Sequence, residues 1–242
     1  MPLQAVESSR LYRQIAEQLR GLITGGEFDA GTRLPAERDL ARQLGVSRPS
    51  VREALIALEV EGWVEVRTGS GIYVQPQAQR ASVARAPAAN GSAEWGPLQV
   101  MQARELVEGE VAALAARHAK KPQLAAMASA LARMREEAES GDGPQGGDEA
   151  FHQAIAQACG NEVLVDTVRG YWNARQEPIF SRLGDHFENA ASWQAALTEH
   201  AAVLAAIRAR DAEGARAAMQ QHLKKATGRY SASWKRANKP GT

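Results

Sequence analysis

The spacing of hydrophobic residues at the start of the chain predicts a first amphipathic helix. Residues 9–23 carry apolar side chains at intervals of three and four positions, which places them on one helical face. The stripe consists of Leu11, Ile15, Leu19 and either Leu22 or Ile23. Two glycines at positions 25 and 26 end the pattern.

Two further helical patterns lie between residues 35 and 61. Pro35 suits the first turn of the second helix, and Gly45 can adopt a positive φ and end it. Ser47 is a good N-cap for the third helix. In the third helix we expect five apolar residues to face inward, namely Val51, Ala54, Leu55, Ile56 and Leu58. We expect three polar residues to lie largely outside, namely Arg48, Ser50 and Arg52.

Two β-favouring runs follow, at residues 63–67 and 71–74. The connection through Thr68, Gly69 and Ser70 is typical of a hairpin. Three helices followed by a hairpin form a winged helix, which we assign to residues 1–75.

The composition changes at residue 76. Residues 76–96 are rich in Gln, Ala, Ser, Pro, Asn and Gly, so we interpret them as a linker. Residues 97–235 show helical periodicity with breaks near 121–122, 140–147, 160–161, 184 and 211. About six helices packed as a bundle are expected there. The predicted fold class is therefore mainly α, with an N-terminal winged helix-turn-helix and an all-helical C-terminal domain.

Composition narrows the setting in which the protein works. Cys159 is the single cysteine, so an intrachain disulfide framework is excluded and a reducing compartment fits best. The first ten residues lack the layout of a signal peptide, and no apolar run reaches about 18 residues. We expect a cytoplasmic protein with no membrane partner.

Overall charge does not indicate nucleic-acid binding, but local charge does. The formal net charge is +1, and residues 1–75 contain nine Arg, no Lys and ten acidic residues. Residues 33–52 nevertheless contain five arginines against Glu37 and Asp39. A small basic surface on a helix-turn-helix favours DNA as the partner.

The start of a helix inserted into the major groove can reach base edges, and arginine can donate two hydrogen bonds to guanine. Arg48 and Arg52 are the candidates for this contact. Arg38, on the preceding helix, can reach a base or the backbone. Phosphate can be bound by Ser47 and Ser50 with the help of backbone amides at the helix start. The alternative is a solvated, arginine-rich helix pair, which the hairpin that follows makes less attractive.

Three segments of this region, at residues 34–41, 46–55 and 62–71, resemble the winged-helix signature of GntR-type bacterial transcription regulators. The resemblance spans nearly all of residues 9–75. It implies that Arg38, Arg48 and Arg52 are the main DNA-binding arginines, assisted by Ser47, Ser50 and Gly69. It also implies a homodimer on double-stranded, pseudo-palindromic operator DNA.

A second candidate site lies in the C-terminal half. Asp148 and His152 are four residues apart and so share one helix face, which is a workable spacing for two metal ligands. His200 and His222 lie on later helical segments that a bundle can bring to the same point. By spacing alone, an Asp/His pair of this kind is more often a surface pair or a core histidine than a metal site.

The same half resembles the FCD effector domain of the FadR-like GntR branch, on the segments 104–108, 148–152, 160–161 and 200–223. In metal-containing members, the ligands occupy the places of Asp148, His152, His200 and His222. The resemblance implies a divalent metal, zinc first, with nickel, manganese or iron as alternatives. Arg104 matches an arginine that holds the effector in the family, and the metal set argues against an acyl-CoA effector.

Asn161 has two interpretations that the residues leave open. It lines an effector pocket or it caps a helix.

The predicted function is a repressor of a catabolic operon, controlled by a small carboxylate, and not an enzyme. Residues 52–74 look particularly like regulators of hexuronate pathways, so a sugar acid is the first expectation for the effector. Lactate-like hydroxy acids and dicarboxylates are the second. One alternative is a metal-dependent hydrolase with Glu149 or Glu199 as general acid or base. Another is a DNA-binding dimer that takes no ligand.

Overall fold

The computed structural model describes residues 11–67, 70–76, 95–141 and 143–237, with side chains described as far as residue 229. The chain forms two compact units that divide after Gly96. Within the described residues, no helix combines the length and the apolar character that crossing a membrane requires.

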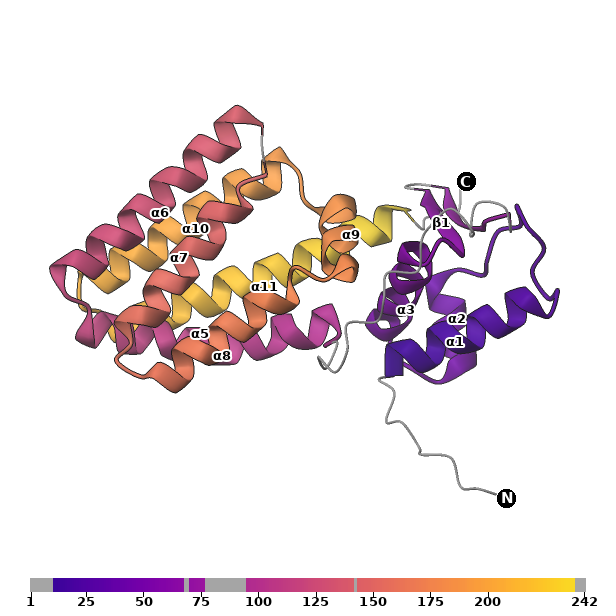
Figure 1. The fold of residues 1–242 in the computed structure, drawn as a ribbon, viewed down its shortest axis with the longest axis horizontal. Helices are drawn as coiled ribbons and strands as arrows, with labels where there is room; N and C mark the ends of the chain where they lie inside the picture. Colours follow the sequence, from indigo (N-terminus) through magenta and orange to yellow (C-terminus); the bar gives the residue numbers. More distant parts are fainter. Residues whose placement is uncertain (1–10, 68–69, 77–94, 142, 238–242) are drawn as a thin grey trace, which may run out of the picture. The chain divides into compact units, whose positions relative to one another are not determined.

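The N-terminal unit contains the predicted three helices and hairpin (Figure 1). The helices are α1 (Leu11–Thr24), α2 (Glu37–Leu44) and α3 (Arg48–Val60), and the strands are β1 (Val64–Arg67) and β2 (Gly71–Val74). The two strands are antiparallel, with Val64 opposite Val74 and Arg67 opposite Gly71. The prediction of a winged helix-turn-helix is therefore confirmed.

The buried face of α1 differs by one position from the predicted stripe. Tyr12, Ile15 and Leu19 are buried in the side that packs against α3, and Ile23 continues this face. Leu11, by contrast, is 48% exposed, so its assignment to the core was wrong. The predicted choice between Leu22 and Ile23 is resolved in favour of Ile23.

The turn between α2 and α3 forms as its residue types predict. Gly45 has φ 65°, and its N–H bonds the carbonyl of Ala41 at the end of α2. The Oγ of Ser47 accepts a hydrogen bond from the N–H of Ser50 at 3.2 Å, which caps α3. Pro35 lies before α2 instead of in its first turn.

Residues 31–34, which we expected to be a plain connector, pair with β2. The N–H groups of Gly31 and Leu34 bond the carbonyls of Val74 and Ile72, each at 2.8 Å. The N–H of Val74 in turn bonds the carbonyl of Thr32 at 2.9 Å. The pairing is too short and too polar to produce a period-two pattern in the sequence.

The described part of the C-terminal unit is a bundle of seven helices (Figure 1). They are α5 (Pro97–His118), α6 (Lys121–Ser140), α7 (Gln145–Ala158), α8 (Glu162–Ala174), α9 (Pro178–Phe187), α10 (Ala190–Arg208) and α11 (Ala212–Ala237). Gly184 itself lies inside α9, and the breaks in this region come on either side of it, before Pro178 and at residues 188–189. Proline is favoured at the first position of α9 because its missing N–H would have no partner there in any case.

Helix α7 packs against α5, α6 and α8. Gly147 permits its close approach to α6, since a Cβ at this position would lie 2.5 Å from the Cα of Met134. The neighbouring Asp148 is thereby brought into the bundle interior, where it is 4% exposed.

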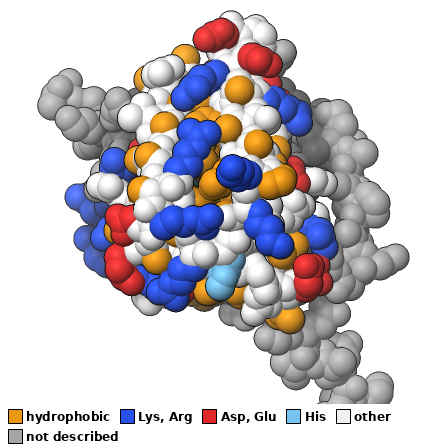
Figure 2. All heavy atoms as spheres, turned by 90° about the vertical axis from the view of Figure 1, so that its left-hand side faces the viewer, with side chains coloured by type: hydrophobic (Ala, Val, Ile, Leu, Met, Phe, Trp, Pro, Cys, Tyr) orange, Lys and Arg blue, Asp and Glu red, His pale blue; other side chains and the backbone are white. Residues whose placement is uncertain are grey.

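Figure 2 views the end of the bundle that lies on the left of Figure 1, and Lys and Arg side chains gather on this face. Arg117 and Arg208, in the last turns of α5 and α10, are both exposed. Basic side chains at helix C-termini interact favourably with the helix dipole, which explains their place without a ligand.

Candidate metal centre and nucleic-acid interface

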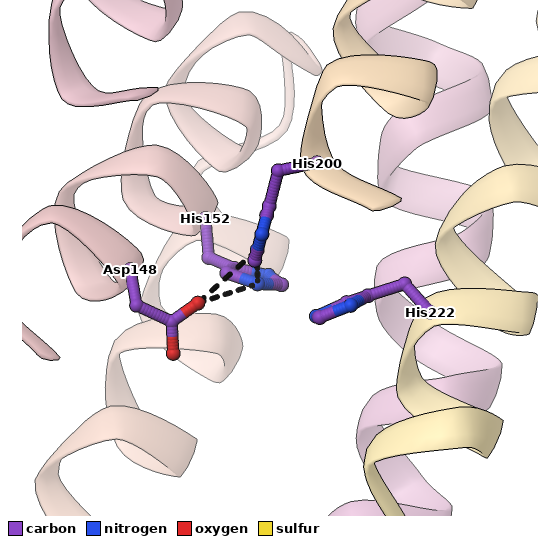
Figure 3. A group of neighbouring side chains, drawn as sticks. All are labelled: Asp148, His152, His200 and His222. Carbon is purple, nitrogen blue, oxygen red and sulfur yellow. Dashed lines mark hydrogen bonds and ion pairs between the residues drawn. The ribbon is translucent and has the colours of Figure 1, made fainter. Parts of the chain in front are cut away.

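Four side chains from three helices meet inside the bundle (Figure 3). Asp148 and His152 come from α7, His200 from α10 and His222 from α11. One potential ligand atom from each lies within 4.8 Å of the others, and all four residues are buried. The structure thus brings together the four residues expected to bind metal.

The ligand atoms are close enough to share one ion. Nε2 of His200 lies 3.1 Å from Oδ1 of Asp148 and 3.1 Å from Nε2 of His152. Nε2 of His152 lies 3.6 Å from the same Oδ1 atom. The ring of His222 approaches from α11, with its centroid 4.2 Å from that of His200.

Each histidine has an acceptor at its Nδ1 atom. For His152 the acceptor is Glu108, for His200 it is the carbonyl of Ala196 at 2.7 Å, and for His222 it is Glu199 at 2.9 Å. An Nδ1–H bond to such an acceptor leaves Nε2 as the lone-pair atom. All three imidazoles therefore keep Nε2 available as a potential ligand atom.

The environment favours the neutral forms of His152 and His222 and the ionised form of Asp148. Burial, together with the nearby His200, lowers the pKa of His222 to about 3, and burial also lowers the pKa of His152. Burial alone would raise the pKa of Asp148, but a hydrogen bond to His200 and the charges around it lower it instead. Neutral imidazoles beside an ionised carboxylate are the protonation states that metal binding requires.

Arg104 lies beside this cluster with an unused donor. It is 1% exposed, and its Nε atom donates to Glu108 at 2.5 Å. Its guanidinium stacks on the ring of Trp172, 4.6 Å from the centroid. Within the described residues, its buried Nη2 atom has no hydrogen-bond partner. A buried donor of this kind is suited to an anionic group that enters the site.

Glu108 joins Arg104 to His152, one of the candidate metal ligands. Burial would raise its pKa, but Arg104 and His152 together lower it to about 2. The carboxylate is therefore ionised at neutral pH and holds an arginine on one oxygen and a ligand histidine on the other.

Two more arginines border the site. Arg175 lies 3.6 Å from Oδ2 of Asp148. Its guanidinium also stacks on Trp172, 4.5 Å from the ring centroid. Arg229 donates two bonds to Glu199, at 3.0 and 3.2 Å. Arg229 was missed in the sequence analysis. Arg229 follows His222 by two helical turns, and this spacing was the available signal.

These groups line a cavity of about 40 Å³, enough for a few water molecules. Its wall between α9 and α10 includes Phe187, Glu188 and Trp193. Its charged and ligand-type lining residues are Arg104, Asp148, Arg175, Glu188, His222 and Arg229.

Asn161 lies at the start of α8 and is exposed. Its Oδ1 atom accepts hydrogen bonds from the N–H groups of Val163 at 3.0 Å and Leu164 at 3.4 Å. This geometry is that of a helix N-cap, which was one of its two expected interpretations. The residues that line the cavity come from other segments.

In the N-terminal unit, Arg38 and Arg48 have side chains that are 78% and 42% exposed. Ser47 and Ser50 lie at the first turn of α3, with their hydroxyl oxygens 2.8 Å apart. Gly69, the expected wing-tip residue, falls outside the described residues.

Arg52 was expected to lie largely outside, and that expectation was wrong. It is 3% exposed, and its guanidinium binds the carboxylate of Glu37. The physical reason is that α2 presents a buried acid to this face of α3, so the arginine is paired inside the unit.

Comparison with known proteins assigns both units. Residues 11–74 match the family of bacterial regulatory proteins, gntR family, and residues 99–225 match the FCD domain. The Uxu operon transcriptional regulator of Escherichia coli (strain K12) is 39% identical over 90% of this chain and 86% of its own length. The Exu regulon transcriptional regulator of the same organism is 36% identical over 91% of this chain and 84% of its own length.

Among solved structures, the Streptococcus agalactiae GntR has a TM-score of 0.48 and 25% identity, and the match covers 91% of this chain and 100% of that one.

The relatives are transcription regulators, which confirms the prediction of a regulator as opposed to an enzyme. Regulators of this family bind operator DNA and commonly form dimers. Glu199, considered above as a general acid or base, is bound by His222 and Arg229. The chain belongs to the GntR family of DNA-binding transcription regulators and carries the FCD domain at its C-terminal half.

Proposed function

We propose that this protein is a cytoplasmic, homodimeric repressor of a catabolic operon, controlled by a small organic acid that binds at a divalent metal centre. The observation that carries the proposal is the convergence of Asp148, His152, His200 and His222 beside the unpaired Nη2 atom of Arg104. We expect a sugar acid, such as a hexuronate, as the effector.

The donor set supports a metal centre. One carboxylate oxygen and three imidazole nitrogens suit zinc first, and also nickel, manganese or iron. Glu108 and Glu199 hold two of the imidazoles from behind, an arrangement that raises ligand basicity and fixes the tautomer. When bound, such an ion supplies coordination positions for carboxylate or hydroxyl oxygens.

Charge at the site favours an anionic effector. Four cations face four carboxylates: the cations are Arg104, Arg175, Lys225 and Arg229, and the carboxylates are on Glu108, Asp148, Glu188 and Glu199. A divalent ion adds net positive charge, which a carboxylate effector offsets. A sugar acid, with its carboxylate, meets this requirement.

The names of the relatives agree with this choice. Two proteins that cover most of the chain are regulators of the Uxu operon and the Exu regulon. Together with the resemblance of residues 52–74 to hexuronate regulators, they place a sugar acid before lactate as the proposed effector.

The cavity size supports a conformational response. A space of about 40 Å³ does not enclose a whole six-carbon acid, and we propose that the wall residues move when it binds. The wall residues that we propose to move lie at the junction of α9 and α10, and they are Phe187, Glu188 and Trp193. A ligand that binds only the opened form shifts the population toward it. In a dimer on half-sites of fixed spacing, such a shift weakens operator binding.

On the DNA side, we propose that Arg38 and Arg48 contact DNA directly from α2 and α3. Ser47 and Ser50 contact phosphate at the start of α3, where backbone N–H groups favour anions. Gly69 is proposed to bring the wing close to the minor groove. Arg52 needs a separate account because it is buried.

The test is an electrophoretic shift of the DNA upstream of the protein's own gene, with and without D-glucuronate, D-galacturonate, L-lactate and succinate. We expect a hexuronate to weaken the shift, and we expect Asp148→Ala to bind DNA without responding. Asp166→Ala, at an exposed acid of α8, is the matched control and should respond normally. If no acid changes the affinity and Asp148→Ala behaves as wild type, control through the metal centre is refuted.

A further inference from the structure

Glu37, the first residue of α2, places one carboxylate between two arginines of α3. It is 1% exposed. Its Oε1 atom accepts a bond from Nε of Arg48 at 2.9 Å. Its carboxylate also accepts bonds from Nε and Nη2 of Arg52 at distances of 3.0 to 3.1 Å. One buried acid therefore holds two arginines that lie one turn apart on the recognition helix.

The two arginines differ in what they present to the outside. The side chain of Arg48 is 42% exposed, and the side chain of Arg52 is 4% exposed. The bond from Arg48 to Glu37 uses Nε, so the edge formed by its two Nη groups remains for a ligand. That edge can donate two parallel hydrogen bonds to O6 and N7 of a guanine. Arg52, by contrast, turns its Nε and Nη2 atoms toward Glu37.

The carboxylate of Glu37 reduces the repulsion between the two arginines and restrains Arg48. Arg48 and Arg52 are four residues apart, so their like charges repel on one helix face unless an acid lies between them. Glu37 is stable in its buried place because Arg52 pairs with it bidentately and Arg48 donates to the same carboxylate. An arginine whose Nε is already held loses less rotamer freedom when it binds DNA.

We propose that Glu37 is a positioning residue for DNA recognition, which orients Arg48 toward a guanine, while Arg52 is the buried countercharge that keeps Glu37 in place. The proposal rests on the proposed role of α3 in contacting DNA. Glu37 reduces the positive charge of residues 33–52, and the proposal gives this carboxylate a role in DNA recognition.

The first experiment selects duplexes from a random DNA library with the full-length protein, which requires no known operator. Wild type should select a half-site consensus, and Arg48→Ala should lose a guanine at one position of it. Glu37→Gln should weaken the preference at that same position. Arg52→Met should also weaken that position and no other, because it acts through Glu37. Loss at a separate position in Arg52→Met would overturn the countercharge role.

The second experiment measures affinity for the selected consensus duplex and for a scrambled duplex by fluorescence anisotropy. Glu37→Gln should lower the ratio of specific to non-specific affinity by about tenfold to a hundredfold, the range for one bidentate base contact. Its non-specific affinity should stay the same or rise, because the variant removes a negative charge. Glu27→Gln removes the same charge from an exposed position and should leave the ratio unchanged.

A purely structural role for Glu37 would lower both affinities together, and an unchanged ratio in Glu37→Gln would equally refute the proposal. If Glu37→Gln does not fold, Glu37→Asp keeps the charge but is one methylene shorter, and it should lower the ratio in the same direction. Failure of wild type to select any consensus would refute the proposed DNA contacts themselves. If wild type selects a consensus and Glu37→Gln selects the same one, only the role of Glu37 is refuted.

Discussion

The Nδ1 atom of His222 lies 2.9 Å from Oε2 of Glu199, and this pair joins α11 to α10 beside the candidate metal centre. Glu199 is itself held by Arg229, which donates to both of its oxygens. Burial would raise the pKa of Glu199, but hydrogen bonds with His222 and Arg229 lower it to about 2. An ionised carboxylate thus fixes the ring of a proposed ligand from behind.

Glu199→Gln should therefore weaken metal binding. The amide is a poorer acceptor for the Nδ1–H group of His222, and loss of such a partner typically reduces metal affinity by about 10- to 100-fold. Competition for zinc with a chromophoric chelator measures this. Glu149→Gln, next to Asp148 on α7, is the control and should bind zinc as wild type does. Equal affinities in the two variants would show that Glu199 does not support the ligand.

Removal of metal should lower the thermal stability of the protein. An ion that binds only the folded state at about 100 times its Kd stabilises that state by about 2.7 kcal/mol, which corresponds to a Tm shift of about 5–10 °C for a domain of this size. Differential scanning calorimetry with and without a chelator checks this. His200→Ala should show no shift on chelation. A chelator effect of the same size in His200→Ala would place the ion elsewhere.

Arg104→Lys should weaken effector binding and leave metal binding intact. Lysine keeps the charge beside Glu108 but lacks the second donor that Nη2 supplies. Loss of a charge-assisted bond of about 1.5–3 kcal/mol predicts an affinity for hexuronate about 10- to 100-fold lower. Isothermal titration of the zinc-loaded protein with D-glucuronate measures it. Arg169→Lys, at an exposed position of α8, should match wild type.

The metal-free protein should lose stability as the pH falls from 7 to 5. The pKa of His222 is about 3 in the folded protein, against about 6.5 for an unperturbed histidine. Below pH 6.5 the unfolded chain therefore binds the extra proton, and the free energy of unfolding decreases with falling pH. At pH 5 the loss from this group is about 2 kcal/mol. The lowered pKa of His152 acts in the same direction.

Urea unfolding of chelated protein at pH 7, 6 and 5 measures this dependence. Glu108 and Glu199, with pKa values of about 2, contribute stability that is lost only below about pH 4.5, so they do not affect this window. His222→Gln should flatten the dependence, whereas substitution of the exposed His118 by Gln should not. A pH-independent free energy of unfolding in wild type would contradict the buried, neutral state of His222.

Features that depend on a few neighbouring residues were predictable. The helical stripe of α3, the left-handed Gly45 and the Ser47 cap each arise from contacts within about four residues. The hairpin also follows from local β propensity and a glycine-containing turn. For the same reason, Asp148 and His152 could be placed on one face of α7 before the fold was known.

Features that depend on packing between distant segments were not predictable. Arg52 is buried because the packing of α2 on α3 brings Glu37, 15 positions away in the sequence, against it. The breaks near Gly184 came before Pro178 and at residues 188–189, since helix ends also depend on what the bundle can bury.

The sequence by itself determined the winged helix and the helical C-terminal half, because helical periodicity and residue type carry that information, and its resemblance to the FCD domain singled out the four candidate ligands. Only the tertiary structure decided which groups orient those ligands. Glu108 lies 44 residues from His152, and Glu199 lies 23 residues from His222, so no local pattern relates them. Burial then lowers the pKa values of His152 and His222, because charging an imidazole inside a packed bundle costs solvation energy that a solvated side chain retains.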